Sequence, residues 1–232
     1  MSGSIVILTG AGISAESGIP TFRGGDGLWE GHRVEDVATP EGFAKDGTLV
    51  QRFYNERRKF LLSGIEPNAG HCALARLEKE WAGAVLLVTQ NIDNLHERGG
   101  SQRVLHMHGE LLKAWCFSCR EQQDILSDLG EESVCRHCGE RGQLRPDVVW
   151  FGEMPYGIAE IEEALSSVDL FISIGTSGQV YPAAGFVELA LAAGAETIEV
   201  NLDETAGSGR FCRRIHGRAS ESVPDLVEEL VR

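Results

Sequence analysis

The chain has 232 residues, a formal net charge of -14, and hydrophobic and charged fractions of 42% and 24%. This length can bury a sizeable core, and these fractions are those of a globular protein rather than of a fibrous or disordered chain. The negative charge repels phosphate backbones, so we expect no direct nucleic-acid partner and regard basic partners, such as lysine-rich peptides, as favourable.

Short runs rich in β-branched residues predict buried strands at 4–9, 85–89, 169–174 and 197–202. Helical patterns lie between and after them, at 68–81, 157–167, 183–193 and 224–231. Strands that alternate with helices predict an α/β fold with a doubly wound parallel sheet of the Rossmann type.

Two segments break this alternation. One is a polar helical stretch at 35–62, and the other, at 113–145, holds four cysteines. We assign both to a smaller module with a helical part and a zinc-binding part. The Rossmann-type domain then comprises 1–34, 63–112 and 146–232.

The first predicted strand is followed by Gly10-Ala11-Gly12-Ile13-Ser14-Ala15, which matches the dinucleotide pattern G-x-G-x-x-G/A. In that pattern the second glycine lets the backbone approach a pyrophosphate. The acidic residue that usually holds the ribose is not evident, since Glu30 and Glu35 follow no predicted strand, which disfavours an ordinary dehydrogenase. A tight turn without a ligand is the alternative, but it would leave an anion-binding helix N-terminus bare.

The pairs Cys116-x2-Cys119 and Cys135-x2-Cys138 are separated by 15 residues, the spacing of a four-cysteine zinc site. Four thiolates complete a tetrahedral shell, so the predicted Zn²⁺ is structural and His137 is not needed as a ligand. The alternatives are two chance pairs or a nucleic-acid zinc ribbon, and the acidic net charge argues against the ribbon.

Two further patterns bear on location. No stretch approaches the ~20 apolar residues of a membrane helix, and residues 1–5 lack the basic region of a signal peptide. The paired cysteines are typical of a metal site in a reducing compartment rather than of a secreted disulfide framework. We therefore expect a cytoplasmic protein without a membrane partner.

The segment 10–29 reads GAGISAESGIPTFRGGDGLW, and QNID at 90–93, HGE at 108–110, the four cysteines and GTS at 175–177 follow it. In order and spacing these motifs resemble the sirtuin family over essentially the whole chain. FYNERR at 53–58 and VVWFGE at 148–153 are most similar to bacterial sirtuins of the CobB type. The resemblance implies an NAD-dependent deacylase that acts on acylated lysine side chains of proteins and releases nicotinamide and O-acyl-ADP-ribose.

The resemblance also implies which residues contact NAD. The glycine-rich turn and the closing loop, in which Phe22 shields the reacting carbon, would supply Gly10, Ala11, Gly12, Ser14, Ala15, Glu16, Thr21, Phe22, Arg23 and Trp29. The segment that contacts the ribose and the nicotinamide amide, with the amide held by Asp93, would supply Gln90, Asn91, Ile92 and Asp93. The adenosine half would be held by Gly175, Thr176, Ser177, Asn201, Leu202, Asp203 and Ala219.

In sirtuin chemistry the acyl oxygen attacks the ribose carbon that bears nicotinamide, an alkylimidate forms, and a base deprotonates a ribose hydroxyl. An imidazole suits this role because its ordinary pKa of about 6.5 leaves it largely neutral. Residues two apart on an extended segment share a face, so spacing does not separate His106 from His108. The family's His-Gly pair matches His108, and we expect His106 and the other histidines to be surface or structural residues.

Two groups would contact the acylated peptide. By resemblance, Val148, Trp150, Phe151 and Gly152 belong to the strand that pairs with its main chain, although the aromatic residues could equally be core. Tyr54 and Arg57 share a face of a predicted helix and match the Tyr-x-x-Arg of sirtuins that accept acidic acyl groups such as succinyl. The alternative is a solvated charged face at 52–59.

Two other functions remain open at this point. An NAD-dependent ADP-ribosyltransferase shares nicotinamide expulsion but transfers the ribose to another acceptor. A non-catalytic NAD-sensing module would hold the nucleotide without consuming it.

Overall fold

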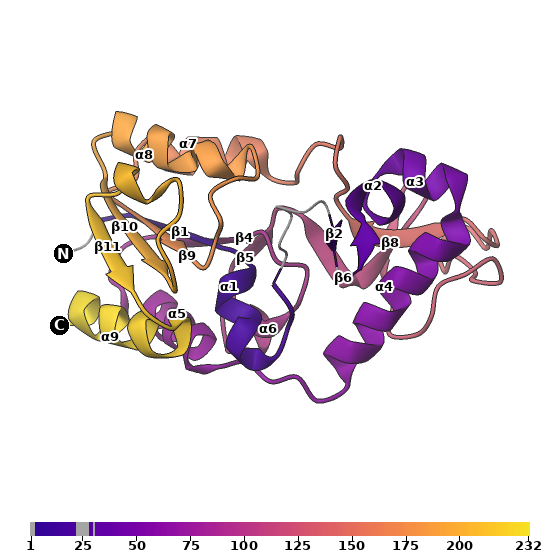
Figure 1. The fold of residues 1–232 in the computed structure, drawn as a ribbon, viewed down its shortest axis with the longest axis horizontal. Coiled ribbons are helices and arrows are strands. Elements are labelled where there is room, and N and C mark those ends of the chain that lie inside the picture. Colours follow the sequence, from indigo (N-terminus) through magenta and orange to yellow (C-terminus); the bar gives the residue numbers. More distant parts are fainter. Residues whose placement is uncertain (1–2, 22–27, 30) are drawn as a thin grey trace.

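The chain forms two lobes of unequal size that lie along its longest axis (Figure 1). The computed structural model describes residues 3–21, 28–29 and 31–232. A parallel sheet with helices on both faces makes the larger lobe, which holds the C-terminal helix. Within the described residues, the smaller lobe combines an antiparallel sheet with three α-helices.

The strands of the larger lobe are β1 (Ile5–Thr9), β4 (Val85–Thr89), β5 (Val104–His106), β9 (Leu170–Ile174), β10 (Glu196–Asn201) and β11 (Arg213–His216). Its helices are α1 (Ala11–Ser14), α5 (Ala69–Glu80), α6 (Leu95–Arg98), α7 (Ile158–Leu165), α8 (Phe186–Ala192) and α9 (Ala219–Val231). The smaller lobe contains α2 (Val34–Val37), α3 (Pro40–Lys45), α4 (Gly47–Leu62), β6 (Gly109–Cys116), β7 (Gln122–Asp124) and β8 (Leu144–Val148). The two-residue strands β2 (Leu28–Trp29) and β3 (His32–Arg33) pair with each other.

The six strands of the larger sheet have the order β11-β10-β9-β1-β4-β5, and every pairing is parallel. Alternate residues of β1 face opposite sides: Ile5 and Ile7 pack with α5 and α9, whereas Val6 and Leu8 pack with α7 and α8. Such a sheet needs strands that are apolar on both faces, which is why β1, β4, β9 and β10 were recognisable as apolar runs. The predicted doubly wound α/β fold is confirmed.

Two helices differ in how well their starts could be predicted. The predicted helix at 68–81 is confirmed, since the Asn68 side chain accepts from the main-chain N–H of Gly70 at 2.9 Å and α5 follows. The start predicted for the last helix at Pro224 is wrong, because α9 begins at Ala219. Glu16 accepts hydrogen bonds from the N–H and hydroxyl of Ser220, at 2.9 and 2.8 Å, and so caps its first turn.

Several strands were not predicted. The edge strands β5 and β11 are short and carry polar residues, so they lack the apolar run of a central strand. The strands β6 and β8 each extend across a predicted boundary, at 112/113 and 145/146. The small antiparallel sheet therefore draws on residues from both predicted modules.

Helix α4 lies against the small sheet and is tied to it by a buried arginine. Arg58, only 1% exposed, donates from Nε to the carbonyl of Leu111 at 3.1 Å and from Nη1 to Asn55 at 2.8 Å. Burial lowers the pKa of Arg58 to about 10. The solvated-face interpretation of 52–59 is therefore wrong for Arg58.

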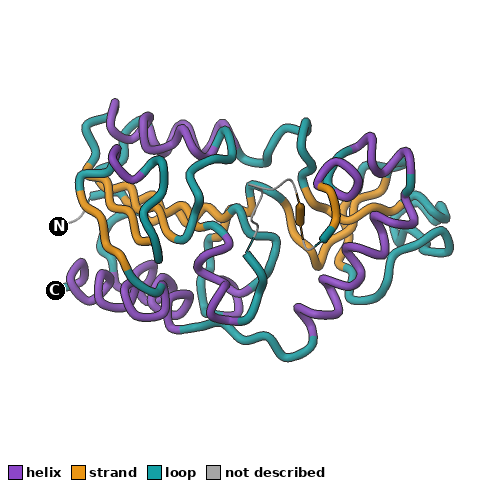
Figure 2. The backbone as a smooth tube through the Cα atoms, in the orientation of Figure 1, coloured by secondary structure: helices purple, strands orange, loops and turns teal. Residues whose placement is uncertain are grey.

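Loops connect the two lobes at 63–68 and 149–157 (Figure 2). Short loops at these crossings leave the lobes facing each other near the carboxyl ends of β1 and β4. In the part of the chain that the structure describes, we find no helix with the length and apolar character that a bilayer crossing requires.

We expect Phe171→Ala to lower the free energy of unfolding by about 3–5 kcal/mol, because this side chain on β9 is 1% exposed and its removal leaves a cavity. Urea denaturation followed by circular dichroism would measure the loss. Leu189→Ala on α8 is the control, since that side chain is 43% exposed and should change stability by under about 1 kcal/mol. Equal losses in both variants would contradict this assignment of the core.

Candidate active site

A cavity of about 880 Å³ opens at the carboxyl ends of β1, β4, β9 and β10 and extends to the smaller lobe. Open parallel sheets bind ligands at this edge, where loops on both sides of the first strand diverge. The volume is within the roughly 300–1,000 Å³ of small-molecule sites. Its position and size fit a dinucleotide together with part of a second substrate.

The glycine-rich turn after β1 is packed against another loop of the sheet. A Cβ atom on Gly12 would lie 2.6 Å from the Cα of Gly175, and one on Gly10 would lie 2.9 Å from the Gly175 carbonyl oxygen. Gly175 itself has a φ of +62°, which favours glycine. These glycines are therefore required by the contact between the two loops, whether or not a pyrophosphate also approaches the turn.

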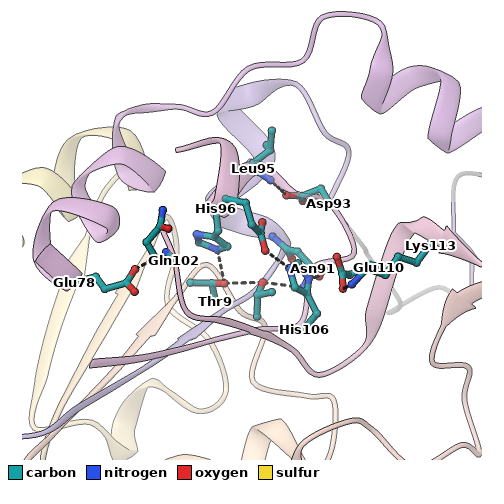
Figure 3. A network of polar contacts seen from close by, with 12 residues as sticks. Thr9, Glu78, Asn91, Asp93, Leu95, His96, Gln102, His106, Glu110 and Lys113 are labelled. Carbon is teal, nitrogen blue, oxygen red and sulfur yellow. Dashed lines mark hydrogen bonds and ion pairs between the residues drawn. The ribbon is translucent and has the colours of Figure 1, made fainter. Parts of the chain in front are cut away.

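The segment after β4 turns away from the sheet and is held by a polar network (Figure 3). The N–H of Asn91 donates to the hydroxyl of Thr89 at 3.0 Å, and that hydroxyl also accepts from Thr9 at 2.8 Å. The Thr9 hydroxyl in turn lies 2.9 Å from Nε2 of His96, and because it donates to Thr89 it accepts from this ring. All four side chains are buried, so the network fixes the start of the loop.

A second chain of hydrogen bonds ends on Asp93. The main-chain N–H of Asn68 donates to Nδ1 of His71 at 3.2 Å, so the ring hydrogen is on Nε2, which lies 3.3 Å from the Ser14 hydroxyl. Ser14 then donates to Asp93 at 3.0 Å. Burial lowers the pKa of His71 to about 4, which keeps this ring neutral. The direction of every hydrogen bond in the chain is thereby determined, and Asp93 is its final acceptor.

The structure distinguishes His106 from His108, which the sequence spacing could not do. Nδ1 of His108 lies 3.1 Å from the carbonyl oxygen of Gln90, which only accepts, so the hydrogen is on Nδ1 and Nε2 carries the lone pair. His108 lines the cavity, and burial lowers its pKa, which favours the neutral ring. The His106 ring instead contacts Asn91 and Glu97, and it does not line the cavity.

Apart from the zinc cysteines, the predicted site residues in the described part of the chain line this cavity with two exceptions, Ser14 and Arg57. Ser14 lies behind the wall in the chain that ends on Asp93. Phe22 and Arg23 lie outside the described residues. Sequence reasoning missed Tyr181 and Arg218, which also line the cavity. Their positions beside the Gly175–Ser177 turn and Ala219 were the available signal.

Tyr54 and Arg57 occupy different environments on α4. Tyr54 lines the cavity and its hydroxyl oxygen accepts from Nε1 of Trp150 at 3.1 Å, while burial raises its pKa and keeps the phenol protonated. The Arg57 guanidinium lies over the Phe53 ring, 3.2 Å from its centroid, and donates to the Phe53 carbonyl at 2.9 Å. Its carbon is 5.0 Å from the centroid of Trp29, a residue that lines the cavity.

The four paired cysteines converge in the small lobe, with their sulfur atoms all within 4.8 Å of one another. The Cys116–Cys138 and Cys119–Cys135 sulfurs are 3.8 and 3.7 Å apart. A tetrahedral ion with metal–sulfur bonds of about 2.3 Å requires sulfur separations of about 3.8 Å. The cluster therefore fits Zn²⁺, and four sulfur ligands leave no position for a substrate.

The two cysteine pairs form equivalent turns. The residue after each pair, Arg120 or Gly139, has a positive φ, of 66° and 78°. The N–H of each bonds the carbonyl of the first cysteine of its pair at 2.9 Å. Because both turns are closed by the main chain, the four sulfur atoms are arranged by the fold itself.

The model of the Sir2 family matches residues 10–182 of this chain. The chain belongs to the Sir2 family. An NAD-dependent protein deacylase of Vibrio vulnificus (strain YJ016) is 60% identical over 229 residues, which cover 98% of this chain and 94% of the relative. Two solved Sir2 homologues, one in complex with NAD and a mutant in complex with 2'-O-acetyl-ADP-ribose, are each 40% identical with TM-scores of 0.88 and 0.87. Both alignments cover 98% of this chain, and they cover 89% and 91% of the homologues.

As a test of the metal site in this Sir2 protein, we expect Cys135→Ser to reduce bound zinc from about one ion per chain to none, because three thiolates hold the ion more weakly than four. Inductively coupled plasma mass spectrometry on purified protein would count the metal. Cys72→Ser is the control, since Cys72 is exposed and lies outside the cluster. Full zinc content in Cys135→Ser would contradict the assignment.

Proposed function

We propose that the chain is an NAD-dependent protein-lysine deacylase that binds NAD and an acylated lysine side chain in the cavity between its lobes. The main supporting observation is the neutral His108 ring at the cavity wall. Its Nδ1 donates a hydrogen bond to the carbonyl of Gln90, which leaves the lone pair on Nε2. The names of the relatives and the acetyl-ADP-ribose complex of a Sir2 homologue support the same reaction.

We assign the binding roles to two modules. The Rossmann-type domain comprises 1–34, 63–112 and 146–232, and the small domain comprises 35–62 and 113–145. The turn at Gly10–Ala15 and the loops at Gly175–Ser177 and Asn201–Asp203 would bind the ADP part of NAD. The Gln90–Asp93 loop would bind the nicotinamide ribose and the amide. Val148–Gly152 would pair with the peptide main chain beside the small lobe.

NAD supplies, when bound, the ribose carbon that accepts the acyl oxygen. The chain's own contributions are then a base and an amide acceptor. His108 would accept the proton of a ribose hydroxyl at Nε2, which is possible because its other nitrogen already holds a hydrogen against Gln90. Asp93, which already accepts from Ser14 and from the N–H of Leu95, would accept a further hydrogen bond from the nicotinamide amide.

Acidic acyl groups such as succinyl would be bound through Tyr54 and Arg57. The Tyr54 hydroxyl oxygen accepts from Trp150, so its own hydrogen is available to a carboxylate in the cavity. Arg57, three residues on along α4, would supply the positive charge. A cytoplasmic location is proposed as well, because none of the six cysteines, all of which lie in the described residues, forms a disulfide.

We expect His108→Ala to reduce formation of O-acyl-ADP-ribose from NAD and an acetyl-lysine peptide by about 100- to 10,000-fold, the usual contribution of a general base. Mass spectrometry of the products would measure this. His216→Ala, exposed and outside the cavity lining, is the control and should retain activity. Retained product formation in His108→Ala would exclude the proposed base.

The same base predicts the pH dependence. Because burial lowers the pKa of His108, the ring stays neutral to below pH 6.5, and kcat/KM should fall only at lower pH, as the ring becomes protonated. A decline whose midpoint lies well above pH 6.5 would indicate another group.

For the acyl preference, we expect Arg57→Met to lower kcat/KM for a succinyl-lysine peptide by about 10- to 100-fold, the value of a hydrogen bond to a charged group, and to leave the acetyl-lysine peptide within about twofold. Arg52→Met, exposed on the same helix, is the matched control. Equal proportional losses on both peptides would show that Arg57 does not contact the acyl carboxylate.

A further inference from the structure

His106 is a buried histidine that the proposed chemistry does not use. Its side chain is only 6% exposed, and it lies at the end of β5, next to the end of β4. Nδ1 lies 3.1 Å from the carbonyl oxygen of Asn91, and Nε2 lies 2.7 Å from a carboxylate oxygen of Glu97. Figure 3 shows His106 and Asn91 side by side in the polar network.

The two partners determine the charge of the ring. A carbonyl oxygen only accepts hydrogen bonds, so Nδ1 must carry a hydrogen, and an ionised carboxylate only accepts, so Nε2 must carry one as well. A ring with both hydrogens is an imidazolium. In agreement, burial lowers the pKa of His106, but the bond to Glu97, the charges of Glu97 and Glu110 and the bond to Asn91 together outweigh burial, so the net shift is upward. Burial raises the pKa of Glu97, but the bond to His106 and the neighbouring positive charges together hold this pKa below its usual value.

The two partners also lie on opposite sides of Asp93 in the sequence. Asn91 comes two residues before Asp93, and Glu97 is in α6, which begins directly after the loop. Asp93 accepts from the N–H of Leu95 at 3.0 Å, so α6 is itself tied to that carboxylate. One ring therefore connects the chain before Asp93 to the helix after it.

The other charged and titratable groups that act on this ring or its partners are His71, which is neutral, and Asp93, His96, Glu110 and Lys113. Glu110, on β6, is paired with Lys113 at 2.5 Å. Burial holds the pKa of His96 well below its usual value, so His96 is neutral. Glu97 is thus the carboxylate bonded to His106. Burial raises the pKa of Asp93, and the His106 charge partly opposes this shift.

We propose that His106 is a positioning residue for the nicotinamide end of the site: as an imidazolium it bridges the Asn91 carbonyl and the Glu97 carboxylate and so fixes the loop that carries Asp93. The inference deepens the proposed function and rests on it, because that function gives Asp93 its ligand. His106 acts through the loop and contacts no substrate.

A positioning role can be separated from a general structural one because the cavity has two ends. The adenosine end is formed by the loops after β9 and β10, which His106 does not contact. Loss of the bridge should therefore weaken binding of nicotinamide strongly and binding of ADP-ribose only slightly, because the terminal ribose is the only part of ADP-ribose that would meet the Gln90–Asp93 loop. A general loss of folding would weaken both.

The test uses the full chain as wild type, His106→Gln, Glu97→Gln and the control His137→Gln, whose exposed ring bonds the Gln122 carbonyl at 3.0 Å in the small lobe. Calorimetry would measure ADP-ribose binding and then nicotinamide binding to the ADP-ribose complex. We expect His106→Gln to weaken nicotinamide binding about tenfold or more and ADP-ribose binding by less than about twofold. Glu97→Gln should have a smaller effect, since a neutral His106 still donates from Nδ1 to Asn91.

The charge of the ring has its own test in the pH dependence of thermal unfolding. A folded-state pKa raised above the ordinary value of about 6.5 contributes stability that is complete below pH 6.5 and is lost as the pH rises through the folded value. The excess Tm of wild type over His106→Gln should be greatest near pH 6 and decrease at alkaline pH. In Glu97→Gln this dependence should be reduced.

Parallel losses of nicotinamide and ADP-ribose binding in His106→Gln, or unchanged nicotinamide binding, would overturn the positioning role. A Tm difference that does not vary with pH would overturn the imidazolium. These measurements need no turnover, so a chain that binds both ligands but does not deacylate would refute the proposed function and leave the positioning role intact.

Discussion

The carbonyl groups of the irregular loop after β4 receive their hydrogen bonds from one later segment of the chain. The carbonyl of Gln90 lies 3.1 Å from Nδ1 of His108, that of Asn91 lies 3.1 Å from Nδ1 of His106, and that of Ile92 accepts from the N–H of Leu111 at 2.8 Å. A buried carbonyl without a partner costs about 1–3 kcal/mol. Residues 106–111 therefore determine the shape of a loop that lies 15 residues or more before them.

Gly109 explains why this segment can serve both lobes. Its φ is +79°, and a Cβ atom there would lie 2.1 Å from the carbonyl oxygen of Asp147. Glycine lets the chain turn directly after His108 and pair with Val148 of β8. The His-Gly pair thus has a physical reason: the same few residues that bond the Gln90–Ile92 loop also begin the sheet of the small lobe, so the positions of the two lobes are coupled at the cavity.

The sequence was most informative where a pattern is local. The apolar runs of β1, β4, β9 and β10 and the cysteine spacing could be recognised because burial on both faces and tetrahedral ligation each impose a short, fixed pattern. The edge strands β5 and β11 could not, since an edge position does not require an apolar run. The start of α9 depends on Glu16, which is 204 residues away from Ser220 in the chain, so no local signal could give it.

The cavity residues also show that local sequence patterns do not reveal contacts with distant parts of the chain. The motifs named most of the residues that line it, but periodicity could not distinguish His106 from His108, because the distinction depends on which carbonyl or carboxylate each ring meets in the fold. It also could not show that Gly12 is required by contact with Gly175 rather than by a ligand alone. In both cases the deciding partner comes from a distant part of the chain.

Four buried or half-buried histidines lie close together behind or beside this cavity, and the fold gives them different charges. His71, His96 and His108 are all shifted toward the neutral ring by burial, whereas His106 is shifted toward the charged one. Burial affects all four in the same direction, so it cannot account for the difference. What distinguishes His106 is the Glu97 carboxylate at 2.7 Å, which α6 presents to it. A single carboxylate at the start of one short helix therefore lets a charged ring and a neutral base stand two residues apart.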